Sequence, residues 1–263
     1  MATKIGFLEA PFRLTFQDAR SNIGGYLKLL TYAVRHTDAL RLLPVRTVFN
    51  RQVYFTAIEA LKITALLALL CGVLVVTQIT AITGNNSELV VNILTWTIVR
   101  ELGPLITAII IVARSSAAIA SELALMRIHG EIQAIDFMNI PHDNYLLVPR
   151  IFGAALSVTA LNVYFQVTAI GGGLFVSSIF QHISFLEHID KFFEMIRPLD
   201  LLLSLIKGLL YGVAIAIPAC YHGINVSHSI TEVPKANTRA VTHGILIIFV
   251  LDAIFAYVNF MLY

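Results

Sequence analysis

Two ionisable residues, Arg100 and Glu101, lie side by side in an apolar stretch, residues 89–113, that carries no other charge. A charge at bilayer depth is costly unless it is paired or faces water, so such residues are candidates for function. A helix breaker follows at once in Leu102-Gly103-Pro104. The arrangement favours a site that handles a polar group over the alternative, a structural ion pair that only fixes helix packing.

A second pair of ionisable residues, Lys207 and Asp252, lies in the apolar stretches 199–221 and 240–262. If the first stretch runs inward from the outer face, Lys207 lies roughly 12 Å deep, at about 1.5 Å of rise per residue. Asp252 lies roughly 18 Å from the inner face, so the two depths coincide in a hydrocarbon core of about 30 Å. Because a lone buried charge is expensive, we expect the two to pair across adjacent helices. A structural pair is favoured over a proton relay or a polar lining.

The composition assigns these residues to a membrane protein. Of the 263 residues, 57% are hydrophobic and 13% are charged, whereas charged residues make up about a quarter of a soluble domain. We therefore predict an all-α integral membrane protein with about five transmembrane helices. The predicted spans are residues 63–82, 89–113, 145–171, 199–221 and 240–262.

Positive charge is concentrated at the start of the chain. Nine of the eighteen Lys and Arg residues precede residue 63, which predicts a cytoplasmic N-terminus and, after five spans, a C-terminus on the outer side. We predict a basic cytoplasmic region, residues 1–62, and a transmembrane domain, residues 63–263. Within the first part, residues 42–60 are apolar on one side of a helix, so we expect an amphipathic helix in the membrane interface.

Two connecting segments are too apolar for simple loops. Residues 115–140 begin with small residues and continue with charges that alternate with methionine and isoleucine. Such a cytoplasmic helix could grip another protein or only cover the bundle, and the pattern alone favours neither. Residues 172–198 have amphipathic spacing that suits the outer interface or a partner protein. The glycines at 171–173 are interpreted as a flexible end of the third span.

The motifs of several enzyme classes are absent from the sequence. It contains no Gly-x-x-x-x-Gly-Lys-[Ser/Thr] loop, and its eight histidines show no His-Glu-x-x-His or clustered ligand spacing. We therefore expect a non-catalytic membrane subunit with no metal, no cofactor of its own and no nucleic-acid partner. Packing is the expected role of the two cysteines, Cys71 and Cys220, which lie in apolar spans.

Short motifs along the chain resemble those of the MlaE-type permeases. The first are Arg100-Glu101-Leu102-Gly103-Pro104, Ala113-Arg114, Ala120-Ser121-Glu122-Leu123 and Met126-Arg127. They continue in the same order with Glu131-Ile132-Gln133-Ala134-Ile135-Asp136, Met138, Val148-Pro149-Arg150 and Gly171-Gly172. The last are Asn237-Thr238-Arg239-Ala240-Val241-Thr242-His243 and Leu251-Asp252. The first span departs from the family's Gly- and Gln-rich pattern, of which it keeps only Gly72 and Gln78.

The resemblance implies an inner-membrane permease of an ABC transporter that moves phospholipids between the two membranes of a Gram-negative envelope. In that family two permeases form a homodimer around a central lipid cavity, and separate cytoplasmic ATPase subunits use ATP and Mg²⁺. A periplasmic ring of MCE-domain proteins sits above the permeases, and a small STAS-domain protein often binds the ATPase.

The resemblance also implies roles for individual residues. Residues 115–140 become a coupling helix, with five residues at or near the ATPase: Glu122, Met126, Arg127, Glu131 and Asp136. A charged lipid headgroup in a dry cavity needs polar partners. The residues implied to contact it are Arg100, Glu101, Leu102 and Gln78. Lys207 and Asp252 also fall on family-like positions, which raises their interest above simple packing.

Two other functions compete with this one. The first is an ion-coupled secondary transporter that uses the Arg100/Glu101 and Lys207/Asp252 pairs as a charge relay and needs no ATPase. The second is a membrane scaffold in which the same charges only hold helices together. The apolar docking-type segment and the lack of clear inverted repeats count against the first.

Overall fold

The structure is a computed structural model that describes residues 16–84, 87–181, 185–227 and 229–262. All regular structure in these ranges is helical, with short 3₁₀ or π-helical segments between several of the α-helices. The α-helices are α1 (Phe16–Arg35), α2 (Leu43–Ala57), α3 (Leu61–Thr83), α4 (Ser87–Leu94), α5 (Gly103–Ile111), α6 (Ala117–Ile128), α7 (Glu131–Phe137), α8 (Val148–Gln181), α9 (Phe185–Met195), α10 (Pro198–Ile224) and α11 (Val233–Leu262). The all-α fold predicted from the composition is confirmed.

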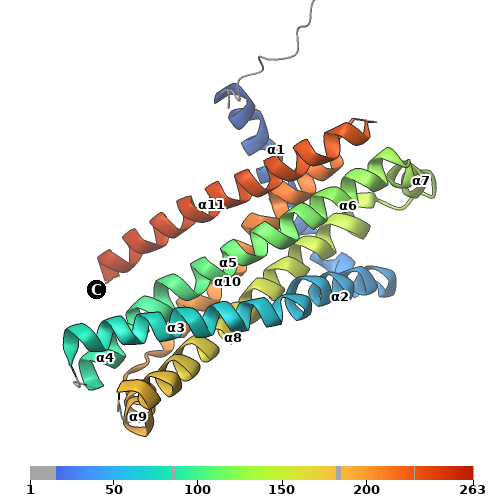
Figure 1. The fold of residues 1–263 in the computed structure, drawn as a ribbon. Helices are drawn as coiled ribbons and strands as arrows, with labels where there is room; N and C mark the ends of the chain where they lie inside the picture. The colour runs from blue at the N-terminus through green and yellow to red at the C-terminus, as the bar shows by residue number, and fades with distance from the viewer. Residues whose placement is uncertain (1–15, 85–86, 182–184, 228, 263) are drawn as a thin grey trace, which may run out of the picture.

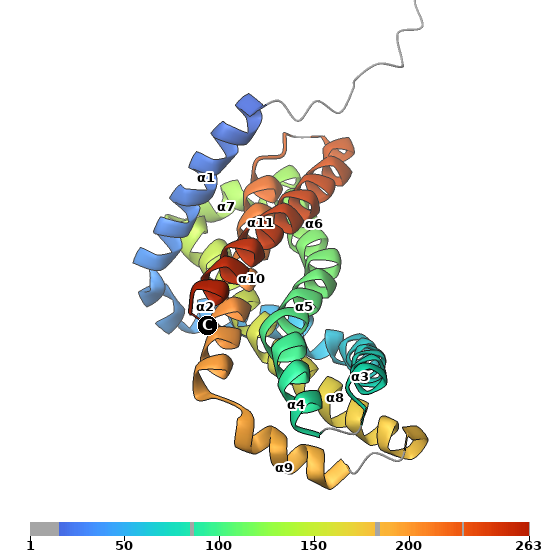
Figure 2. The same ribbon diagram turned by 90° about the vertical axis from the view of Figure 1, so that its left-hand side faces the viewer.

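Within the described residues, five helical runs are long and apolar enough to cross a membrane. They are Leu43–Thr83, Glu88–Ile128, Asp143–Val176, Pro198–Ile224 and Ile230–Asn259. The long helices lie side by side in an elongated bundle, with α4 and α9 at one end and α6 and α7 at the other (Figure 1). Figure 2 shows the same two ends after a quarter turn. The chain is therefore a multi-pass membrane protein.

The predicted spans agree with the observed helices best where the apolar run ends abruptly. The first and fourth spans match α3 and α10 to within three residues at each end. The second is longer than predicted, because the helix continues through a π-helical segment, Val112–Ser116, into α6. The fifth begins at Val233, seven residues before the predicted start. Hydropathy marks the apolar part of a helix, and charged residues such as Lys235 and Arg239 extend the helix beyond it.

Glycines allow α3 and α10 to pack closely against α8. A Cβ added to Gly72 of α3 would lie 2.0 Å from the carbonyl oxygen of Ala169, and one added to Gly212 of α10 would lie 2.4 Å from the Cα of Ala155. The interpretation of the glycines at 171–173 as a flexible helix end was wrong, because they lie inside α8. Gly173 packs directly against Gly72. These small residues bring two spanning helices together, as is common in membrane bundles.

The residue pattern does not predict α1, which is held to the bundle by a cluster of three side chains. The hydroxyl of Tyr26 lies 2.8 Å from Nε2 of His222 and 2.8 Å from Nδ1 of His243, and these two nitrogens are 2.8 Å apart. Burial raises the pKa of the Tyr26 phenol above its usual range, so the hydroxyl stays protonated and can donate to an imidazole. This Tyr26 cluster (Tyr26, His222 and His243) connects α1 to α10 and α11.

The amphipathic helix predicted at residues 42–60 corresponds to α2, which continues through a 3₁₀ turn, Ile58–Ala60, into α3. The helix packs against α8, where Gln52 lies next to Gly153. Its position in the membrane interface stays a prediction. The second amphipathic segment, predicted at residues 172–198, includes another helix, α9, which packs against α4.

The coupling helix predicted at residues 115–140 consists of two helices. α6 extends the second span as far as Ile128, and the short α7 then covers Glu131–Phe137. Gly130 between them has φ 76°, in the left-handed region that glycine adopts without strain. The polar and apolar pattern continues across this turn, which is why a single helix was predicted.

Candidate functional site

The second span changes its hydrogen-bond pattern where the sequence places its charged pair. Residues Thr95–Leu102 form a π-helix, here called η3, and the N–H of Gly103 donates to the carbonyl of Ile98, five residues earlier. Pro104 follows and has no N–H to continue the pattern. Single π-turns occur frequently at functional sites. The local sequence therefore distorts the helix at Arg100 and Glu101.

Arg100 forms a buried ion pair with a residue from another helix. Its Nη2 lies 2.9 Å from Oδ1 of Asp200, and both side chains are less than a tenth exposed. Asp200 lies in the first turn of α10, where the helix dipole favours a negative charge. Arg100 and its neighbour Glu101 thus have separate partners on another helix.

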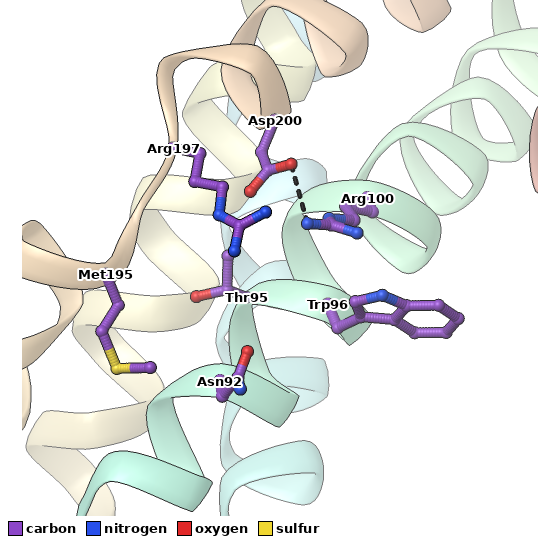
Figure 3. Close-up of a pocket in the computed structure, with 7 residues that line it drawn as sticks. All are labelled: Asn92, Thr95, Trp96, Arg100, Met195, Arg197 and Asp200. Atoms are coloured by element: carbon purple, nitrogen blue, oxygen red, sulfur yellow. Dashed lines mark ion pairs between the residues drawn. The ribbon is translucent and has the colours of Figure 1, made fainter. Parts of the chain in front are cut away.

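A cavity of about 510 Å³ opens beside this ion pair. Its lining residues are Asn92, Thr95, Trp96, Arg100, Met195, Arg197 and Asp200. Figure 3 shows the side chains of Arg100 and Arg197 on either side of Asp200. Two guanidinium groups and one carboxylate leave the cavity one positive charge in excess. Guanidinium groups bind carboxylate and phosphate oxygens in pairs, so the cavity suits an anionic group.

Glu101 belongs to a second polar cluster, centred on Lys207 of α10. The Lys207 ammonium lies 2.9 Å from Glu101 Oε2, 3.3 Å from Asp252 Oδ1 and 2.8 Å from the carbonyl oxygen of Arg100. An ammonium group has three N–H donors, so these three oxygens satisfy it. The pairing of Lys207 with Asp252 expected from their depths is present in the geometry, with Glu101 as a third member.

Two neutral side chains complete this second cluster. The Tyr211 hydroxyl donates to Asp252 Oδ1 at 2.6 Å, and the Asn259 amide donates to Glu101 Oε1 at 3.3 Å. Each carboxylate therefore has a neutral donor in addition to the shared ammonium. Such charge-assisted bonds are stronger than neutral ones and stabilise charges away from water.

Three residues that sequence reasoning missed, Asp200, Ser204 and Tyr211, share one face of α10 with Lys207, which it did single out. All four side chains of this polar stripe are buried. Their spacing of four, three and four residues is that of a single helix face. The sequence contains a signal that could have identified them: polar residues recur at helical spacing within a span whose buried face is expected to be apolar.

A third, uncharged cluster lies between the other two. Gln166 Nε2 of α8 is 2.6 Å from Ser204 Oγ, 3.0 Å from Asn162 Oδ1 and 3.4 Å from the carbonyl oxygen of Val99 in η3. Asn162 also donates to the Ser204 hydroxyl at 2.8 Å. All three side chains are buried. This amide cluster (Asn162, Gln166 and Ser204) braces η3 against α8 and α10.

The four residues implied to contact substrate do not all line the cavity. Arg100 does, whereas Glu101 turns to the Lys207 cluster. Leu102 is half-buried at the end of η3, and Gln78 is exposed on α3. The cavity instead includes Arg197 and Asp200, which the sequence patterns do not single out.

The five residues implied to couple to an ATPase lie on α6 and α7. Glu122 pairs with buried Arg150 at 3.2 Å, and Met126 Sδ lies 3.9 Å from the same guanidinium. Asp136 pairs with His142 at 2.6 Å. The carboxylate of Glu131, at the start of α7, lies 3.9 Å from His129, while Arg127 is half-buried near the end of α6.

The described residues hold no group of three or more His, Cys, Asp or Glu side chains arranged to bind a metal ion. Several buried polar groups of the spans are bonded to one another, through the Arg100–Asp200 pair, the Lys207 cluster and the amide cluster. The cavity beside the first of these, with its two guanidinium groups, can recognise a charged or polar group.

Residues 49–258 match the family described as Permease MlaE. A probable ABC transporter permease protein of Rickettsia prowazekii is 26% identical over 204 residues, which cover 76% of this chain and 78% of that protein. The intermembrane phospholipid transport system permease protein MlaE of Haemophilus influenzae is 23% identical over 217 residues, 80% of this chain and 82% of that protein. A probable ABC transporter permease protein of Synechocystis is 29% identical over 172 residues, 64% of each chain.

Proposed function

The chain belongs to the MlaE permease family, and from this premise we propose that it is the permease subunit of an ABC transporter that moves phospholipids between the inner and outer membranes. The name of the Haemophilus influenzae relative supports this substrate. The observation in the structure that carries the proposal is the cavity with Arg100 and Arg197 among its lining residues. In a membrane protein, an anionic group at this place is most simply a lipid headgroup.

The headgroup phosphate would contact Arg100 and Arg197, while Asp200 keeps Arg100 in position at 2.9 Å. Guanidinium groups favour a phosphate because they donate two parallel hydrogen bonds. Glu101, Leu102 and Gln78 remain proposed contacts to other parts of the substrate. A homodimer, with a second copy of the chain across the bundle, would enclose the acyl chains in a central cavity.

The cytoplasmic segment α6–α7 is the proposed docking surface for a separate ATPase, which would bind ATP and Mg²⁺. Three apolar side chains at the end of α7 are exposed: Phe137, Met138 and Ile140. Phe137 is 89% exposed, and large exposed apolar side chains are typical of interaction sites. Glu122, Met126, Arg127, Glu131 and Asp136 of the same two helices are proposed to lie at or near the ATPase. On the outer side, an MCE-domain protein is the proposed partner, and a STAS-domain protein is expected on the ATPase.

The proposed setting is the bacterial inner membrane, with the N-terminus in the cytoplasm and the C-terminus in the periplasm. Purification in mild detergent from native membranes, followed by mass spectrometry, tests the partners. An ATPase and an MCE-domain protein in stoichiometric amounts are the expected result. A chain that purifies without a nucleotide-binding partner would contradict the proposal.

Substitution of Arg100 tests the substrate half of the proposal. In the reconstituted complex, Arg100→Ala is expected to leave assembly intact and to abolish transfer of labelled phospholipid, because the cavity loses its buried guanidinium. Glu101→Ala is expected to do the same through the Lys207 cluster. Arg41→Ala is the matched control, since Arg41 lies on the surface with a side chain that is 87% exposed. Normal transfer by both membrane variants would remove these residues from the mechanism.

One observation favours the second candidate, an ion-coupled transporter. Lys207 bridges two carboxylates, Glu101 and Asp252, and intramembrane carboxylates occur in the proton relays of pumps and transporters. That function requires transport driven by a proton or ion gradient in vesicles without ATPase. Transfer that depends on ATP and is indifferent to the gradient would exclude it.

A further inference from the structure

We infer that Gln166 is a positioning residue that holds the π-helical segment η3 in register and so aims Arg100 at the cavity. The part that concerns η3 stands on geometry alone, and only the consequence for lipid transfer rests on the proposed function. Gln166 touches neither the cavity nor either charged cluster, so it acts through the backbone that carries Arg100.

Pro104 removes main-chain donors at the point where η3 ends. The N–H of Gly103 is used by the carbonyl of Ile98. The next donor in the same register would be the N–H of residue 104, which proline lacks. The carbonyl of Val99 therefore loses Gly103 as its α-helical donor and Pro104 as its π-helical donor. The carbonyl of Arg100 likewise loses its α-helical donor at residue 104.

Two side chains from other helices supply replacement donors to these carbonyls. Gln166 Nε2 lies 3.4 Å from the carbonyl oxygen of Val99, and Lys207 Nζ lies 2.8 Å from that of Arg100. Buried carbonyl groups are almost always paired, so such donors stabilise the break in the helix. The Lys207 ammonium also serves two carboxylates, whereas all the acceptors of Gln166 Nε2 are uncharged.

The amide of Gln166 is itself held in place. Ser204 Oγ at 2.6 Å and Asn162 Oδ1 at 3.0 Å fix it between α8 and α10. Gly103 leaves room for it, because an added Cβ would lie 3.0 Å from Gln166 Cγ and 2.6 Å from the carbonyl oxygen of Ile98. The amide of Gln166 is therefore held in a fixed position beside the break in the second span.

The register of η3 decides where Arg100 points. A helix advances by about 100° per residue, so removing the extra residue of a π-turn would rotate the preceding segment by about that angle relative to α10. Arg100 would then leave Asp200, and Trp96 would leave its place at the cavity. Trp96 lies in η3 and is the single tryptophan of the chain, so its fluorescence reports the orientation of this segment.

Gln166→Met, which keeps the length of the side chain but removes its amide, tests this role in the full chain in lipid nanodiscs. We expect a shift of the Trp96 emission maximum and a change in its quenching by brominated phosphatidylcholine. Pro104→Ala restores a main-chain N–H that can serve Val99, so Gln166→Met is expected to have little effect in that background. Thr159→Val on α8 is the control, since the Thr159 hydroxyl donates to the Ala155 carbonyl of its own helix, and the change should leave Trp96 fluorescence unaltered.

Unchanged Trp96 fluorescence in Gln166→Met would overturn the inference. So would a change of the same size with and without Pro104→Ala, because the effects of the two substitutions would then be additive, as expected if Gln166 only fills space. If Gln166→Met does not fold, Ser204→Ala removes the 2.6 Å anchor and is expected to cause a smaller shift in the same direction. In the reconstituted transporter, Gln166→Met should lower lipid transfer on the order of tenfold, the equivalent of one buried hydrogen bond. A shift of Trp96 together with normal transfer by Arg100→Ala would support the positioning role and refute the proposed function.

Discussion

The polar groups in the middle of the bundle and those on the α6–α7 segment at its end make different kinds of contact. In the middle, Lys207 is 1% exposed and its ammonium contacts oxygens from two other parts of the chain, η3 and α11. On the α6–α7 segment, Asp136 pairs with His142, only six residues away, and its side chain is 46% exposed. A buried charge needs fixed partners, whereas an exposed one can exchange its partner for water. The first region therefore holds one geometry, whereas the charged groups of the second can exchange their partners.

Arg150 lies between these two extremes. Its side chain is 4% exposed, and it meets Glu122, which is 51% exposed. The pair connects the start of α8 to α6, so it joins the buried bundle to the exposed surface of α6. A partner that binds at Glu122 would therefore act on a residue anchored in the core.

The largest expected effect comes from Lys207→Met. It leaves Glu101 and Asp252 without their shared cation, and removal of one partner from a buried ion pair destabilises a protein by about 3–5 kcal/mol. The measurement is the temperature at which the detergent-solubilised protein loses its monodisperse peak in size-exclusion chromatography. Lys191→Met is the matched control on α9, where the lysine pairs with exposed Glu187 at 3.1 Å, and it should cost less than about 1 kcal/mol. Equal losses in the two variants would contradict the contrast between the regions.

An intermediate effect is expected from Tyr26→Phe. The change removes the hydroxyl from the Tyr26 cluster and leaves buried His222 and half-buried His243 with one donor fewer, at a cost of about 1–3 kcal/mol. Because the contact joins α1 to the bundle, limited proteolysis should cleave α1 faster while the spanning helices stay protected. Tyr32→Phe on the same helix is the control, since that ring stacks on His36. Unchanged cleavage of α1 would show that the cluster does not hold it.

The smallest effect on stability is expected from Phe137→Ser. Phe137 is almost fully exposed, so the free energy of unfolding should change by less than about 0.5 kcal/mol. Capture of the ATPase in a pull-down with the purified subunit should nevertheless be lost. Phe193→Ser on α9, where the ring is 72% exposed at the opposite end of the bundle, should leave capture unchanged. Retained capture by Phe137→Ser would place the docking surface elsewhere.

The sequence by itself determined that the chain crosses a membrane, approximately where it does so, and which charged residues lie inside. These properties follow from hydropathy summed over about twenty neighbouring residues, which is a local quantity. The sequence also identified Arg100, Glu101, Lys207 and Asp252, because a charge in an apolar run is visible without any structure. The family motifs are likewise short runs of neighbouring residues, so they too can be identified from the sequence alone.

Only the tertiary structure decided which groups meet. Arg100 could have paired with Glu101, yet the break at Pro104 and the packing of α10 give it Asp200 instead. Neutral residues such as Gln166 and Asn162 acquire a role only when α8 brings them to η3 and α10. Likewise, α1 is attached by histidines about two hundred residues later in the chain. Partner choice depends on how helices pack, and helix packing is set by contacts that a linear pattern does not contain.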